Sequence, residues 1–137
     1  MRVFLQVFII LILFNSTIFA DDFRDIKKIS LKKDEQKKFL VKYGPYERLF
    51  KFRWTLYTND GLVIFRSYDK VVAQNILYLG HRSSSFRLEL KAKGADYYKI
   101  PYILVKFREF DFETKEAKFE LLLSDEKMEV EIEELKK

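Results

Sequence analysis

Residues 48–68 read RLFKFRWTLYTNDGLVIFRSY, and the alternation inside this stretch decides the fold. From 50 to 56 every second residue is apolar, and the residues between them are polar or charged: Phe50, Phe52, Trp54 and Leu56 against Lys51, Arg53 and Thr55. Successive side chains of a β-strand point to opposite faces, so a period of two predicts a strand with one buried face. We therefore expect Trp54 in a core, with Lys51 and Arg53 outside it.

A turn signal, Asn59-Asp60-Gly61, follows this strand. Tight hairpin turns need positive φ angles, and Gly61 is the residue expected to adopt one. Residues 62–68 alternate again and are expected to form the return strand. The sequence thus predicts an antiparallel hairpin near the centre of the chain.

Period two recurs along most of the remaining sequence. Further strands are expected at 26–31, 37–43, 86–91, 103–112, 118–123 and 128–133. The apolar positions change phase after Glu109, which predicts a β-bulge near 108–109. Residues 69–80 could form a helix between Asp69 and Gly80, but their β-branched and aromatic residues favour a strand.

Eight or nine short strands separated by turns indicate an all-β fold. We expect an antiparallel β-sandwich with immunoglobulin-like, Greek-key connections, and a small β-barrel of the lipid-binding type is the alternative. Strands with one apolar and one charged face fit antiparallel sheets that expose one face to water. The chain has no internal repeat and no linker that would divide it, so one domain is expected.

The first 20 residues read MRVFLQVFIILILFNSTIFA. Arg2 precedes an apolar core, and Ala20 stands directly before Asp21, which is the order of a secretory signal peptide. We expect cleavage between Ala20 and Asp21, and an uncleaved membrane anchor is the alternative. The remaining 21–137 would be a single exported β-domain, periplasmic in the first instance, with an extracellular or membrane-anchored location as alternatives.

The chain has 137 residues with no Cys and one His. These counts exclude a disulfide framework, a thiolate metal site, a Cys nucleophile and a His-rich metal cluster. His81 stands beside the serine run 83–85 without a nearby acid to orient it, so a solvated loop is expected. Two carboxylate pairs are expected on solvated strand faces: Glu109 with Asp111, and Glu129 with Glu131. The sequence therefore predicts no catalytic residue, no metal site and no cofactor.

Charge is distributed unevenly along the chain. Residues 21–108 carry 20 Lys and Arg against 10 Asp and Glu, whereas residues 109–137 carry 5 against 11. Outward cations on neighbouring strands would create a strongly positive patch. The residues expected to form this partner-binding patch are Lys51, Arg53, Arg87, Lys91, Lys106 and Arg108. In the alternative interpretation, the acidic C-terminal strands pair with the basic strands inside the fold.

These observations favour a non-catalytic exported domain that binds a protein or an anionic envelope component. Nucleic acid is not expected as a partner, because the chain is exported and carries no RNA-binding aromatic motif. A small barrel that carries an apolar ligand is the second hypothesis. An exported hydrolase is the third, and the single His and the missing catalytic motifs disfavour it.

Overall fold

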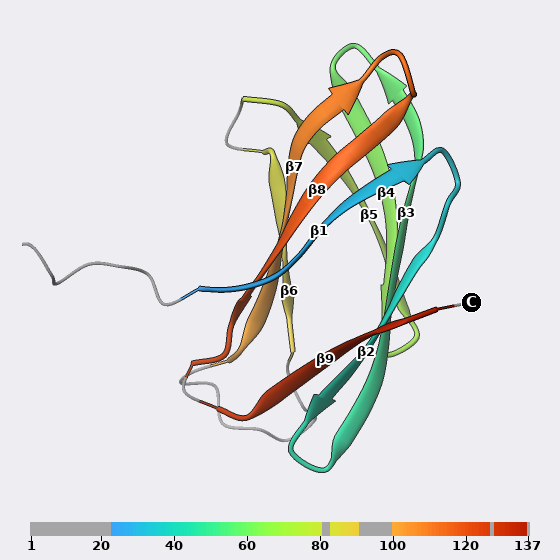
Figure 1. Cartoon of the computed structure of the whole chain (residues 1–137). Helices are drawn as coiled ribbons and strands as arrows, with labels where there is room; N and C mark the ends of the chain where they lie inside the picture. Colours follow the sequence, from blue (N-terminus) through green and yellow to red (C-terminus); the bar gives the residue numbers. More distant parts are fainter. Residues whose placement is uncertain (1–22, 81–82, 91–99, 127, 137) are drawn as a thin grey trace, which may run out of the picture.

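The computed structural model describes residues 23–80, 83–90, 100–126 and 128–136, and every regular element in these ranges is a β-strand (Figure 1). The strands are β1 (Arg24–Lys32), β2 (Lys37–Tyr43), β3 (Tyr46–Thr58), β4 (Gly61–Tyr68), β5 (Val71–Tyr78), β6 (Ser85–Glu89), β7 (Tyr102–Asp111), β8 (Glu116–Ser124) and β9 (Val130–Leu135). The strand predicted within 69–80 is thus confirmed as β5. No helix that could cross a membrane is found in the described ranges.

The strands form two antiparallel sheets that pack face to face. One sheet has the order β1-β8-β7-β6, and the other has the order β5-β4-β3-β2-β9. The predicted β-sandwich is confirmed, and the barrel alternative is wrong, because the two sheets do not close on each other. β2 to β5 form a meander of consecutive hairpins, and β9 returns to pair with β2.

Two-residue turns with positive φ angles join the meander strands. Asn59 and Asp60 have φ angles of 50° and 62°, and Asp69 and Lys70 have 48° and 67°. Two consecutive positive φ angles match the right-handed twist of hairpin strands. The expected hairpin is confirmed, but the role expected for Gly61 is wrong. It begins β4, where a Cβ atom would lie 2.9 Å from the Tyr78 ring.

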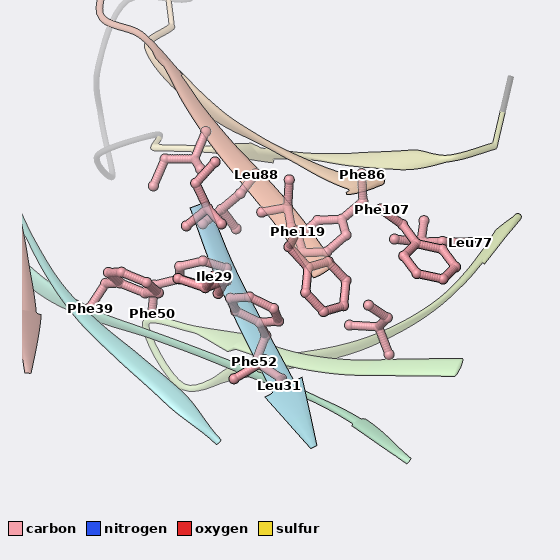
Figure 2. Close-up of a cluster of buried hydrophobic side chains, with 14 of the residues drawn as sticks. Ile29, Leu31, Phe39, Phe50, Phe52, Leu77, Phe86, Leu88, Phe107 and Phe119 are labelled. Atoms are coloured by element: carbon pink, nitrogen blue, oxygen red, sulfur yellow. The ribbon is translucent and has the colours of Figure 1, made fainter. Parts of the chain in front are cut away.

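Phenylalanine rings fill the space between the sheets (Figure 2). Phe50 and Phe52 stack with ring centroids 5.5 Å apart, and Phe119 of the opposite sheet meets Phe52 edge-on at 5.5 Å. Each such pair contributes about 0.5–1.5 kcal/mol beyond the area it buries. Trp54 lies in the core as predicted, and its Nε1 donates a hydrogen bond of 2.7 Å to the Leu31 carbonyl.

Irregularities in strand register change which side chains face outward. The bulge predicted near 108–109 is confirmed by the shift between Phe107 and Glu109. A second shift, between Trp54 and Leu56, was not expected. It turns Leu56 outward, so that 49% of its surface is exposed, and Tyr57 takes the inward position. The expectation that Leu56 shares the buried face of Trp54 is therefore wrong.

Candidate functional site

The two sheets separate the cations that the sequence grouped into one patch. Lys51 and Arg53 lie on β3, on the outer face of the five-stranded sheet. Arg87 lies on β6, with Lys106 and Arg108 on β7, in the four-stranded sheet. Because the sheets pack through their inner faces, these two groups point to opposite sides of the molecule. The expectation of a single patch is corrected to two separate groups.

Five residues named by the sequence analysis lie outside the described residues, and one of them is Arg2 of the expected signal peptide. The other four are Ala20 and Asp21 at the expected cleavage site, His81 beside the serine run, and Lys91 of the expected patch.

Carboxylates and an aromatic ring contact two cations of the four-stranded sheet, Arg87 and Arg108. Arg108 donates through both Nε and a terminal nitrogen to Glu120, each at 2.7 Å. Arg87 lies 3.8 Å from a Glu89 oxygen and stacks 3.7 Å above the centroid of the Tyr102 ring. Lys106 is the register partner of Glu120. Arg87 and Arg108 thus have carboxylate partners within the fold, and Lys106 lies opposite Glu120 across two strands.

The acidic C-terminal strand is also paired within the fold. Glu134 of β9 forms ion pairs with Lys27 of β1 and with Lys37 of β2, the latter at 2.9 Å. On the outer face Glu131 is the register partner of Lys42. Opposite charges that face each other across strands contribute about 0.2–1 kcal/mol.

Three cations on the outer face of the five-stranded sheet form what we call the outer basic cluster: Lys38, Lys51 and Arg53. Lys38 of β2 is the register partner of Lys51 of β3, and Arg53 follows on the same face. Within the described residues, none of the three lies within ion-pair distance of a carboxylate. The sequence pattern did not indicate Lys38 as a member of the patch, because its position opposite Lys51 depends on the register of the β2–β3 hairpin.

An apolar surface borders the outer basic cluster. Leu56, Val63 and Ile76 are register partners in one row across β3, β4 and β5. Leu56 and Ile76 are 49% and 45% exposed, and Phe65, the register partner of Arg53, is 37% exposed. We call these four residues the apolar stripe. The outer face thus joins positive charge to an exposed apolar surface, a combination that is typical of contact sites.

The described carboxylates form no metal-binding group, and the carboxyl of Asp111 has a lowered pKa. No group of three or more His, Cys, Asp or Glu side chains that could hold a metal ion occurs in the described ranges. Backbone N–H groups of Thr114 and Glu113 donate to Asp111 at 3.2 Å and 2.9 Å and lower the pKa of its carboxyl. A general acid needs a raised pKa, so this shift has the wrong direction for that role.

No protein-family profile, curated protein or solved structure matches the chain. The candidate site therefore rests on the geometry of the outer basic cluster and the apolar stripe.

Proposed function

We propose that this protein is an exported, non-catalytic β-sandwich that binds an acidic protein or another anionic envelope component through the outer face of its five-stranded sheet. Residues 1–20 would direct export, and the periplasm is the proposed location. The outer basic cluster carries the proposal, because its three cations have no carboxylate partner in the described structure.

The physical argument starts from the pair Lys38 and Lys51. Like charges that face each other across two strands are destabilising, and an anion bound between them would relieve the repulsion. Positive potential on one face also speeds the encounter with an acidic partner. The adjoining apolar stripe would add contact area once the partner is docked, at about 25 cal/mol per Å² of apolar surface removed from water.

The barrel-carrier hypothesis loses its structural basis. The two sheets remain open at their sides, and buried apolar side chains occupy the space between them (Figure 2). The proposed contact therefore lies on the surface of the sandwich rather than in its interior.

A charge-reversal pull-down tests the proposed face. The wild-type chain would be compared with a Lys51→Glu, Arg53→Glu variant for capture of partners from envelope extracts. We expect at least about tenfold weaker capture by this variant, because removing interface charges slows association and leaves the partner's charges unpaired.

The matched control makes the same charge change on the other sheet, through Lys106→Glu of β7 with Lys118→Glu of β8. This control should retain the partner. Equal capture by the β3 variant and the wild type, or a loss confined to the control variant, would contradict the proposal.

A further inference from the structure

A groove opens on the side of the sandwich where the edge strands β5 and β6 meet. It encloses about 410 Å³, and its lining includes three arginines, one from each of three strands: Arg48, Arg66 and Arg87. β5 ends the five-stranded sheet and β6 ends the four-stranded sheet (Figure 1). Residues of both edge strands line the groove. It is distinct from the outer basic cluster.

Arg66 is the lining cation that points between the two sheets. It alternates with the buried Leu62 and Ile64, so it points between the sheets, and its guanidinium carbon lies 4.9 Å from the centroid of the Phe86 ring. Its Nε donates to the Asn75 side-chain oxygen at 2.7 Å. Burial lowers the pKa of Arg66, which reflects the loss of water around its charge.

The other two arginines already have counter-ions. Arg48 is paired with Asp69, and Arg87 lies 3.8 Å from Glu89. Among the described residues Arg66 has no carboxylate partner, and only its Nε makes a hydrogen bond. Its two terminal nitrogens present the planar fork that binds a carboxylate with two parallel hydrogen bonds.

The adjoining edge of β5 carries no charged residue in its sequence VVAQNILY. Natural edge strands are commonly protected by charges, and β1, β6 and β9, which end the other sheet edges, all contain them. The N–H group of Tyr78 bonds outside the ladder, to the Ser83 carbonyl. In an antiparallel ladder only every second residue directs its backbone N–H and C=O groups to the neighbouring strand. The backbone groups of Val72, Gln74 and Ile76 therefore point to the same side as those of Tyr78, away from β4.

We infer that the groove binds an extended, acidic peptide segment of a partner, which adds a strand to β5 and places a carboxylate on Arg66. Ala73 is the register partner of Arg66, and its small side chain leaves the path from Arg66 to the edge open. An inward side chain of an added strand beside Ala73 would therefore reach the guanidinium. A second copy of β5 does not fit this role, because β5 contains no carboxylate.

A matched pair of peptides tests the inference with the full chain. The probe is a capped heptapeptide, Thr-Val-Thr-Glu-Thr-Val-Thr, and its control has Gln in place of Glu. Binding is followed by amide chemical shifts. We expect the Glu peptide to bind about tenfold or more tightly than the Gln peptide and to shift the amides of Val72, Gln74 and Ile76.

Variants of the chain separate the two parts of the site. Arg66→Gln should remove the preference for Glu over Gln while leaving weak binding at the edge. Gln74→Pro removes an N–H group that faces the open edge and should abolish binding of both peptides, whereas Gln74→Thr should retain it.

Equal affinity of the wild-type chain for the two peptides would overturn the inference without any variant. It would also be overturned if shifts are confined to residues around Lys38 and Lys51, or if the edge forms a dimer that Gln74→Pro dissociates. None of these three results would show that the outer basic cluster fails to bind its own partner, so failures of the two proposals are distinguishable.

Discussion

Trp54 and Leu56 show where residue-by-residue sequence reasoning succeeds and where it stops. Trp54 is buried as its place in the alternation predicts. Leu56 is exposed because the register slips between the two residues. Leu56 and Tyr57 are adjacent and both could be buried, so the alternation is compatible with either residue facing the core. The sequence pattern therefore does not indicate the register shift. The apolar stripe could not have been found from the sequence for this reason.

Asp111 gives a residue-scale prediction about pH. Its carboxylate accepts hydrogen bonds from the backbone of Thr114 and Glu113, so its pKa in the folded protein lies below its ordinary value. The ionised carboxylate therefore stabilises the folded state fully at pH values above its pKa in the unfolded chain, about 3.9. This stabilisation is lost as the pH falls through the lower pKa of the folded protein.

An NMR titration of the side-chain carboxyl carbons measures this pKa directly. We expect the Asp111 midpoint to lie below the ordinary aspartate value, because the backbone hydrogen bonds favour its ionised form. A midpoint at or above 3.9, the ordinary aspartate value, would contradict the hydrogen-bonded turn.

At the scale of the elements, local pattern predicts the strands well and the turns less well. The alternation of apolar and polar residues places eight of the nine described strands, because each has its buried face packed against one core, and β-branched and aromatic residues favour the ninth, β5. The turn between β4 and β5 was ambiguous, since Asp69 can also cap a helix. The structure resolves it as a hairpin turn, with both Asp69 and Lys70 at positive φ.

Lys70→Gly should stabilise the β4–β5 hairpin. Lys70 is exposed with a φ of 67°, a conformation that costs an L-residue about 1–2 kcal/mol and glycine almost nothing. Glycine also lowers the free energy of unfolding by about 0.5–1 kcal/mol, because it gives the unfolded chain more freedom. We therefore expect Lys70→Gly to raise the free energy of unfolding by about 0.5–1 kcal/mol in total.

Urea unfolding measures the change, and Lys33→Gly is the matched control. Lys33 is also an exposed turn residue, but its φ is not positive, so glycine there should lower the free energy of unfolding by about 0.5–1 kcal/mol. A loss of stability on Lys70→Gly, equal to that of the control, would refute the strained turn.

At the scale of the whole molecule, the sequence predicts a sandwich but not which strands share a sheet. β1 pairs with β8 and β2 pairs with β9, and these contacts join opposite ends of the chain. Local alternation carries no information about such distant pairings. The six predicted cations were therefore grouped by sequence pattern, whereas the fold places Lys51 and Arg53 on one outer face and the described others on the opposite sheet.

The central claim is that the outer face of the five-stranded sheet is the face that contacts the partner. Ser67 lies on this face as the register partner of Lys51, and Ser30 lies on the outer face of the opposite sheet beside Lys118. A photocrosslinking residue would replace each serine in turn, and covalent capture of partners from envelope extracts would be compared. The account predicts a crosslinked partner from position 67 and none from position 30. Crosslinking from position 30 alone, or equally from both positions, would contradict it.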